Sequence, residues 1–407
     1  MTNRRTFLKT TLLGTLPLAV SGFSFAKGSS LHSPKAGYLL NEDFKTDPIS
    51  RGWEKFANEG ASLPTWNNGN GHYISARSGY WLTPAFAVEP YKYYKVIYKA
   101  KGIKEGEINI QYLDNENKPY ITDTYDLMFL TENWEEHIFC FRAFGLAKMS
   151  RIQLISRNPE IFVDSISVEE TDLEFVHKWR KEILSTMPVI PGSSVGKSQF
   201  LATTAETLQR GGRLRIVMLG DSTINDTGNS IYEASLQKAF PKVKFEVVNS
   251  VRGSTGCTWY QYENRVNEFV LRFNPDLVII GGISNGYDVN AIRSVIQQVR
   301  KSQNPDILIL TDSITPEEIL HKRFVENNPL VSKETGNEMI RLYPEKLKTM
   351  AIEEKVDLLD MRTKWNTYTR SSSKPFDWFM RDEIHANLRG KQVVGQILLD
   401  YLIESFK

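Results

Sequence analysis

Ser222 has the sequence setting that best suits a nucleophile. It follows Gly220 and Asp221, at the point where the apolar run Leu214 to Leu219 stops. Such a run predicts a buried parallel strand, and helical spacing resumes from Asn229 to Phe240. The serine is therefore expected on a strand-to-helix turn, where backbone N–H groups are available to an oxyanion. Taken alone, Gly-Asp-Ser is also typical of a turn or a helix cap.

His385 is the base that such a serine needs, because an unassisted hydroxyl is a weak nucleophile at neutral pH. It lies just before the last predicted helix, and Asp382 precedes it by three residues. That spacing allows one tight loop to bring the carboxylate to the imidazole ring. We expect Asp382, and not the neighbouring Glu383, to orient the ring. Alone, the pair is equally consistent with a loop histidine beside an incidental aspartate.

Two further strand ends offer hydrogen-bond donors to an oxyanion. Gly253 follows the second predicted strand, where an unobstructed backbone N–H can face an ester oxygen. Asn285 follows the third strand and carries a side-chain amide. Each residue alone also suits a turn or a helix cap. Together with Ser222 and His385 they lie at strand ends of one domain, where open parallel sheets bind their ligands.

The segments that position these residues alternate between strand and helix. Beyond Leu214 to Leu219, the predicted strands are 245–249, 276–280, 306–310 and 356–361, each after a helix-like segment. Five such strands predict an α/β three-layer sandwich with a parallel sheet over residues 213–407.

Gly220-Asp-Ser222 and Asp382-Glu-Ile-His385 resemble the first and last conserved blocks of the SGNH/GDSL hydrolase family. The resemblance covers about residues 213 to 407 and implies a flavodoxin-like fold and ester hydrolysis through an acyl-enzyme. It also implies roles for the residues above. Ser222 is the nucleophile, His385 the general base and Asp382 its partner. The N–H groups of Ser222 and Gly253, with Asn285, form the oxyanion hole.

The two middle blocks depart from the family pattern. The usual Gly-x-Asn-Asp becomes Gly281-Gly-Ile-Ser-Asn285, one residue longer from Gly282. The second block holds two glycines, so Gly256 is an alternative to Gly253, which we favour because it is nearer the strand end. Thr223 stands where the name GDSL has leucine, and this difference does not weaken the resemblance.

Residues 37–170 are expected to form an all-β jelly roll or sandwich, because β-branched and aromatic runs alternate there with Gly, Asn and Asp clusters. Asn41 to Phe44 and Phe162 to Val168 resemble the first and last strands of carbohydrate-binding modules. Whether this domain binds glycan or only supports the enzyme is left open. A helical and Pro/Gly-rich linker is expected at 171–212.

Residues 1–26 read as a cleavable export signal of the twin-arginine type, with Arg4 and Arg5 before a short apolar run. The sequence therefore predicts a periplasmic or extracellular protein without an integral membrane segment in its mature form. A net charge of +2 over 407 residues gives no indication of a nucleic-acid partner. Cys140 and Cys257 are expected to be unrelated buried thiols, and neither a cofactor nor a metal is indicated.

These observations favour a carbohydrate O-acyl esterase, most simply one that removes acetyl groups from a polysaccharide or oligosaccharide. The alternatives are a lipid or short-chain aryl esterase, and a non-catalytic glycan-binding surface protein. Several residues flank the motif blocks and are expected to line the acyl and sugar sites, with packing as the other interpretation. They are Arg252, Trp259, Tyr260, Tyr287 and Trp378.

Overall fold

The computed structural model describes residues 37–69, 71–103, 105–157, 160–189, 198–311, 321–322 and 332–406. All of them lie within one compact unit of the chain. The expected export signal, residues 1–26, lies outside the described residues, as does part of the expected linker. None of the described helices is long and apolar enough to cross a membrane.

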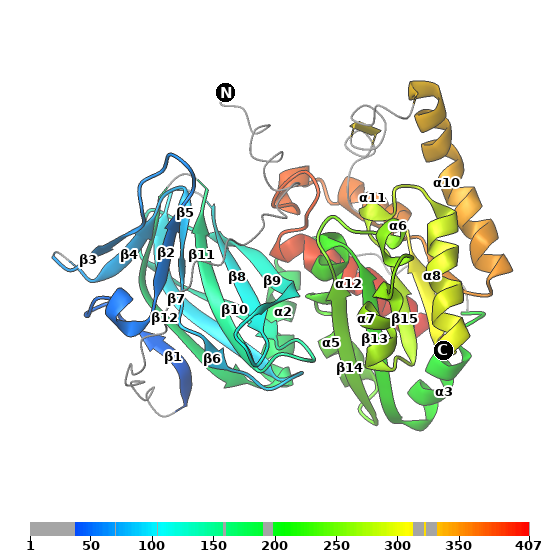
Figure 1. The fold of residues 1–407 in the computed structure, drawn as a ribbon, viewed down its shortest axis with the longest axis horizontal. Helices are drawn as coiled ribbons and strands as arrows, with labels where there is room; N and C mark the ends of the chain where they lie inside the picture. Colours follow the sequence, from blue (N-terminus) through cyan, green and yellow to red (C-terminus); the bar gives the residue numbers. More distant parts are fainter. Residues whose placement is uncertain are drawn as a thin grey trace. The chain divides into compact units, whose positions relative to one another are not determined.

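The N-terminal part is a β-sandwich of two antiparallel sheets, as predicted (Figure 1). The first has the order β10-β7-β12-β4-β3, with β1 beside β12, and the second β2-β5-β11-β8-β9, with β6 beside β11. The strands are β1 (Tyr38–Glu42), β2 (Glu54–Ala57), β3 (Thr65–Asn67), β4 (Tyr73–Ala76), β5 (Gly79–Leu82), β6 (Phe86–Ala87), β7 (Tyr93–Gly102), β8 (Glu105–Leu113), β9 (Pro119–Phe129), β10 (Glu135–Arg142), β11 (Met149–Ser156) and β12 (Ile161–Thr171).

Alternation of polar and apolar side chains explains this sandwich. Along β7, every second residue is buried, which is typical of a strand with one face on a core. Trp53 and Trp81 are almost fully buried and pack edge to face. Tyr80 instead lies on the outer face of β5 and stacks on Phe56. β9 is the edge strand of its sheet.

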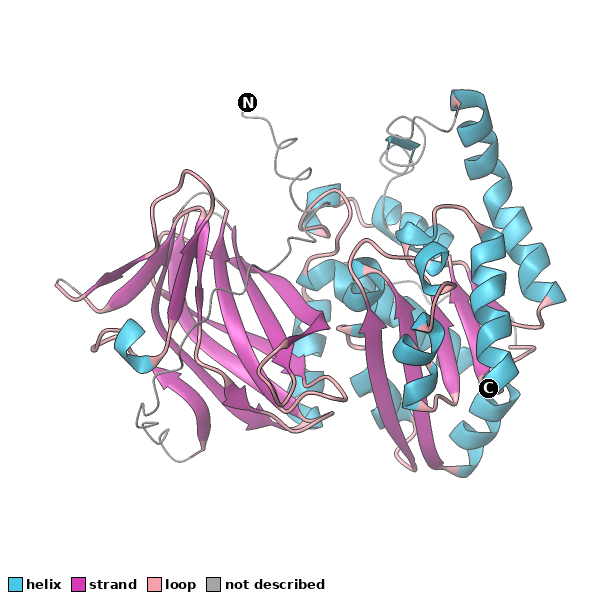
Figure 2. Ribbon diagram, in the orientation of Figure 1, coloured by secondary structure: helices cyan, strands magenta, loops and turns pink. Residues whose placement is uncertain are grey.

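The C-terminal part contains a five-stranded parallel sheet in the order β14-β13-β15-β16-β17, which is the flavodoxin-like arrangement expected. Figure 2 shows its strands among the helices. The strands are β13 (Gly212–Gly220), β14 (Val243–Val251), β15 (Leu277–Ile280), β16 (Asp306–Leu310) and β17 (Asp357–Leu359). The helices are α2 (Leu173–Ser185), α3 (Ala202–Arg210), α4 (Ser222–Gly228), α5 (Tyr232–Ala239), α6 (Cys257–Tyr260), α7 (Arg265–Phe269), α8 (Val289–Ser302), α10 (Lys333–Glu353), α11 (Met361–Ser371) and α12 (Leu388–Glu404). The 3-10 turns here are η2 (Leu271–Phe273), η3 (Ile283–Asn285) and η5 (Phe376–Trp378), whereas η1 (Ile49–Arg51) lies between β1 and β2 of the sandwich.

The central strand β13 is buried on both faces. Ile216 and Met218 join the cluster that includes Trp365 of α11, whereas Val217 and Leu219 join the cluster on the other face of the sheet. Its continuous apolar run therefore packs against two helix layers at once. α2, within the expected linker, packs against α5 and α12.

Both cysteines are buried free thiols, as predicted. Cys140 lies on β10 of the sandwich, and Cys257 begins α6 of the parallel-sheet domain. Burial raises the pKa of the Cys140 thiol to about 12, which keeps it protonated and unreactive at neutral pH.

Candidate active site

Ser222 is the first residue of α4, directly after the turn that ends β13. The turn requires a glycine at position 220, because a Cβ there would lie 2.4 Å from the carbonyl oxygen of Gly281. The backbone N–H of Ser222 lies at the helix start, where N–H groups have no partner within the helix. The strand-to-helix delivery of the serine is therefore as the sequence predicted.

Asp221 anchors this turn and is fully buried. One carboxylate oxygen accepts hydrogen bonds from the backbone N–H (2.9 Å) and hydroxyl (2.7 Å) of Thr223, so Asp221 caps α4. The other accepts the backbone N–H of Ser284, in the turn that follows β15, at 2.7 Å. The aspartate of Gly-Asp-Ser thus joins two strand ends, and Thr223 serves the cap through its hydroxyl.

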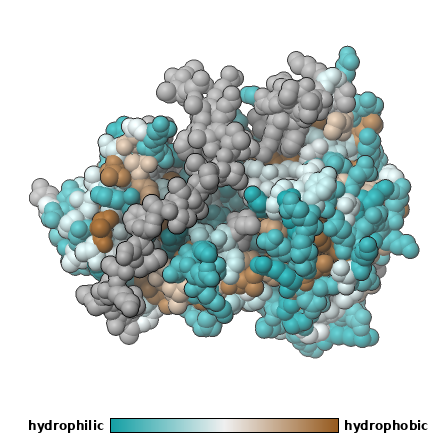
Figure 3. All heavy atoms as spheres, in the orientation of Figure 1, coloured by the Kyte–Doolittle hydropathy of each residue, from teal (hydrophilic) through white to brown (hydrophobic). Residues whose placement is uncertain are grey.

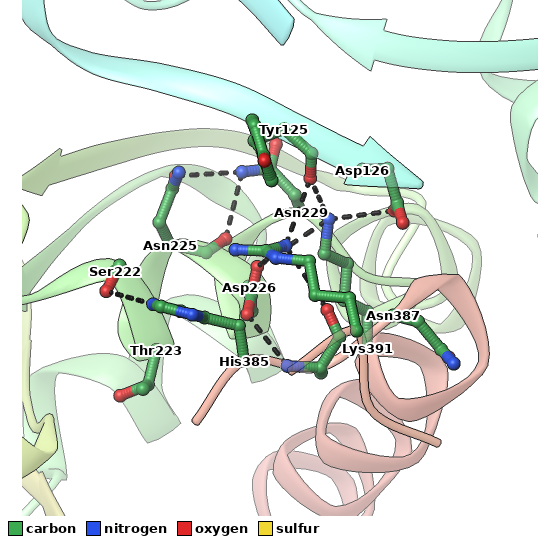
Figure 4. Close-up of polar contacts among 12 residues, drawn as sticks. Tyr125, Asp126, Ser222, Thr223, Asn225, Asp226, Asn229, His385, Asn387 and Lys391 are labelled. Carbon is green, nitrogen blue, oxygen red and sulfur yellow. Dashed lines mark hydrogen bonds and ion pairs between the residues drawn. The ribbon is translucent and has the colours of Figure 1, made fainter. Parts of the chain in front are cut away.

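Ser222, His385 and Asp382 form a continuous line of hydrogen bonds. The Ser222 Oγ lies 2.7 Å from His385 Nε2 (Figure 4). The other ring nitrogen, Nδ1, lies 2.8 and 3.0 Å from the two Asp382 carboxylate oxygens. An ionised carboxylate can only accept, so Nδ1 carries the proton. Nε2 is then left as the acceptor for the Ser222 hydroxyl, which is the arrangement of a nucleophile and its general base.

The Asp382 carboxylate also organises its own loop. One of its oxygens accepts the backbone N–H groups of Ile384 and His385, both at 2.8 Å. Burial opposes its ionisation, but the hydrogen bond from His385 and the positive charge of Arg381 outweigh that effect. The pKa of Asp382 therefore lies well below its ordinary value, and the group stays ionised at neutral pH. Glu383 is exposed.

The loop that carries His385 is closed by main-chain contacts. Met380 and Ala386 form an isolated antiparallel bridge, and the Arg381 N–H donates to the His385 carbonyl at 2.9 Å. Asn387 then caps α12 by accepting the N–H groups of Arg389 and Gly390. We call residues 381–386 the histidine loop.

The two candidate oxyanion glycines differ in their surroundings. Gly253 lies in an exposed turn after β14, and a Cβ there would have no atom within 4 Å. The Arg252 N–H donates to the Gly220 carbonyl at 3.1 Å, which holds this turn beside the Ser222 turn. Gly256 is buried, and a Cβ there would lie 2.1 Å from the Ser284 carbonyl oxygen. Gly253 is thus the more exposed of the two, and its role as the oxyanion donor stays a prediction.

Asn285 is buried at the end of η3. Its side-chain oxygen accepts the Cys257 N–H at 2.8 Å, and its amide nitrogen donates to the Gly282 carbonyl at 3.2 Å. These contacts tie α6 to the turn after β15. The predicted donation from Asn285 to an oxyanion would use the same amide group and stays a prediction.

The predicted substrate contact of Tyr260 is wrong. Its side chain is fully buried, and its hydroxyl donates to the Gly220 carbonyl at 2.8 Å. The tyrosine therefore supports the nucleophile turn from within the core and presents no surface to a substrate. Tyr287 is also buried and packs edge to face on Tyr343, so its predicted contact is unsupported too.

Three of the predicted substrate residues keep some exposure. Trp259 is half-buried and contacts two guanidinium groups, with Arg252 4.5 Å and Arg265 3.7 Å from the ring centroid. Trp378 is half-buried beneath the Arg389 guanidinium, at 4.4 Å. Their roles stay predictions.

Sequence reasoning missed Asp226, which lies one helical turn after Ser222 on α4. Its carboxylate accepts the backbone N–H of Ala386 at 3.1 Å, next to His385. The signal available in the sequence was its spacing, because residues four apart share a helix face. An aspartate at that spacing usually faces solvent, so nothing in the sequence distinguished it.

Comparisons with solved structures found several likenesses of low sequence identity. They include a two-domain esterase active on acetylated mannans, with 17% identity, 51% of this chain and 53% of that chain covered, and a TM-score of 0.38. The Bacillus subtilis protein YXIM has 13% identity, with coverage of 87% and 88% and a TM-score of 0.33. The carbohydrate-binding module CBM1 of BiXyn10A has 18% identity, with coverage of 33% and 99% and a TM-score of 0.26. The chain spans about half the length of the two-domain esterase chains it matches.

A comparison with the curated proteins found no match. The family comparison gave one specific result, which covers the nucleophile, the candidate oxyanion residues and the histidine loop. Residues 218–393 match the model of the GDSL-like Lipase/Acylhydrolase family. The region of the parallel-sheet domain that carries Ser222 and His385 is thus a GDSL-like lipase/acylhydrolase domain, preceded in the chain by a β-sandwich.

Proposed function

We propose that the protein is an exported serine esterase that removes O-acyl groups, most simply acetyl, from a carbohydrate. The observation that carries the esterase part is the line from Ser222 Oγ through His385 to Asp382, at 2.7 and 2.8 Å. Export rests on the twin-arginine-type sequence of residues 1–26.

The reaction follows from these contacts. His385 Nε2 takes the hydroxyl proton as Ser222 Oγ bonds to the ester carbonyl carbon, and Asp382 stabilises the imidazolium that forms. The backbone N–H groups of Ser222 and Gly253 and the amide of Asn285 would stabilise the oxyanion. His385 returns the proton to the departing sugar hydroxyl, which leaves Ser222 acylated. Water, deprotonated by the same nitrogen, then releases the carboxylic acid and restores the serine.

A polar sheet face supports the carbohydrate part of the proposal. On the outer face of the second sandwich sheet, Gln153 pairs across strands with Asn109, and Asn109 with Tyr125. Gln153 accepts amide hydrogen bonds from Asn109 (3.0 Å) and Gln111 (3.2 Å). Amide side chains of this kind suit hydroxyl groups better than acyl chains. Asn109 itself is buried, so we call the partly exposed residues Tyr80, Gln111, Arg151 and Gln153 the polar face.

The polar face extends to the candidate active site. Tyr125 continues the same row, and the Arg381 guanidinium of the histidine loop lies 4.5 Å from its ring centroid. At the other side of the sheet, Tyr80 stacks on Phe56, a pair able to carry a sugar ring. Figure 3 shows one side of the molecule, on which hydrophilic residues predominate and hydrophobic residues form small separate groups. A polysaccharide chain held on the polar face would lead toward Ser222.

The first prediction is that Ser222→Ala lowers kcat by about 10⁴- to 10⁶-fold, because the hydroxyl is the nucleophile. Turnover is measured on acetylated polysaccharides and on short- and long-chain aryl esters, with Ser302→Ala, at the exposed end of α8, as the control. Preference for long acyl chains would support the lipid-esterase alternative. Equal turnover by wild type and Ser222→Ala would overturn the assignment of the nucleophile. An inactive wild type that binds glycan would support the alternative of a non-catalytic glycan-binding protein.

The second prediction separates two adjacent carboxylates. Asp382→Asn should lower kcat by about 10⁴-fold, because loss of the orienting acid leaves the imidazole in the wrong tautomer. Glu383→Gln is the matched control and should stay within a few fold of wild type. Steady-state kinetics on 4-nitrophenyl acetate give both values. A large loss for Glu383→Gln beside a small one for Asp382→Asn would reverse the assignment.

The third prediction tests the two roles of Asn285. Asn285→Ala should lower both kcat, by about 10²- to 10³-fold, and thermal stability, because it removes an oxyanion donor and leaves the Cys257 N–H without its acceptor. Asn285→Asp keeps an acceptor for that N–H, but it replaces the amide donor with an oxygen that faces the Gly282 carbonyl, so it should lose both kcat and Tm. Unchanged kcat in both folded variants would make Asn285 purely structural.

The fourth prediction concerns the polar face. Tyr80→Ala should raise KM for an acetylated polysaccharide roughly 3- to 10-fold, which corresponds to the loss of one aromatic stacking contact. Its kinetics on 4-nitrophenyl acetate should not change, because that ester does not reach the sandwich. Tyr73→Ala, on the other sheet, is the matched control. An equal KM for Tyr80→Ala and wild type would exclude this face from substrate binding.

A further inference from the structure

Four buried charged side chains link the sandwich to the histidine loop. Asp126 of β9 binds Lys391 of α12 at 2.8 Å, Lys391 lies 3.6 Å from Asp226 of α4, and Asp226 binds Arg381 at 3.0 Å. Each of these side chains is at most 7% exposed. Negative and positive charges alternate along the series. Figure 4 shows Lys391 between Asp126 and Asp226, with Asp226 nearest to His385.

At one end of this series, Asp226 and Arg381 bind the backbone of Ala386, the residue after His385. Asp226 accepts the Ala386 N–H at 3.1 Å, and Arg381 donates to the Ala386 carbonyl at 3.2 Å. Both peptide groups of Ala386 are thereby fixed by side chains that also bind each other. Because Asp226 is on the same helix as Ser222, one helix carries both the nucleophile and the anchor of the base.

The other end of the series is supplied by the sandwich. The Tyr125 carbonyl accepts hydrogen bonds from both Arg381, at 3.4 Å, and Lys391. Two residues earlier on the same strand, the Asp123 carbonyl accepts from the Asn225 side chain of α4 at 2.5 Å. The edge strand β9 thus contacts the nucleophile helix, the histidine loop and α12.

Asp126 is one carboxylate partner of Lys391, and its removal leaves Lys391 with Asp226 and with the Asp123 carboxyl, whose pKa burial raises. Lys391 is divided between Asp126 and the Asp226 oxygen that also binds Arg381. A buried charge that loses its partner is strongly unfavourable. Without Asp126, Lys391 would move toward Asp226 and compete with Arg381 for that oxygen. The hold of Asp226 and Arg381 on Ala386 would then weaken.

We propose that Asp126, Lys391, Asp226 and Arg381 are positioning residues that set the distance between Ser222 and His385, so that the β-sandwich is part of the framework of the active site. The proposal rests on the esterase function proposed above. Its consequence is that a change in the sandwich, at Asp126, alters the chemical step without touching the substrate.

The test is Asp126→Asn, assayed on 4-nitrophenyl acetate. We expect kcat to fall about 10- to 100-fold with KM within twofold, because a small displacement of a catalytic group costs rate and not binding. The double variant Asp126→Asn/Lys391→Met removes the unpaired lysine and should recover most of kcat. Arg381→Lys, which keeps the charge but not the forked donor, should lose kcat in the same way.

The matched control is Glu233→Gln. Glu233 and Arg142 form another buried ion pair between the sandwich and the parallel-sheet domain, but neither contacts the histidine loop. This variant should lower Tm and leave kcat of the folded protein unchanged. The positioning role is overturned if Asp126→Asn and Arg381→Lys both behave like Glu233→Gln. Equal inactivity of wild type and Ser222→Ala would instead remove the proposed function itself.

Discussion

The hydrogen bond between Ser222 and His385 joins residues 163 positions apart in the chain, and α4 holds them in register. Ser222 opens this helix, and Asp226 follows one turn later, about 6 Å along the axis. Since the helix is rigid over one turn, the position of Asp226 fixes the position of the Ala386 peptide relative to the Ser222 hydroxyl. The geometry of the site depends on this single turn.

The hydrogen-bonded grouping of Ser222, His385 and Asp382 could be predicted because each residue lies in a short local pattern. Gly220 ends an apolar strand before Ser222, and Asp382 is within a tight loop of His385. The parallel sheet followed from five apolar runs that alternate with helix-like segments. What these patterns have in common is that neighbours along the chain determine them, so no knowledge of distant contacts was required.

The positioning residues could not be predicted, because their meaning depends on distant contacts. Lys391 and Asp126 are ordinary charged residues in the sequence, yet their side chains are 2% and 1% exposed in the fold. Tyr260 shows the opposite error. It follows a motif block and was expected at the substrate, but it packs inward to bind the Gly220 carbonyl. Burial at all three positions is decided by the packing of separate segments.

The position of β9 at the edge of the sandwich explains why the contact between the sandwich and the parallel-sheet domain is polar. β9 is an edge strand, and an exposed edge presents carbonyl groups that can pair with another chain. The carbonyls of Asp123 and Tyr125, two residues apart, are instead bound by Asn225, Arg381 and Lys391 of the parallel-sheet domain. Apolar side chains would leave those carbonyls unsatisfied, at about 1–3 kcal/mol each.

Hydrogen-bond donors are therefore required at this contact. Buried charged donors are stable only when carboxylates pair with them. Asp126 and Asp226 meet that need, one from each domain. The same set of contacts satisfies the strand edge and fixes the histidine loop. If β9 were paired with another strand of the sandwich, its carbonyl groups would not bind the histidine loop. The polar contact therefore couples the two domains more specifically than hydrophobic burial could.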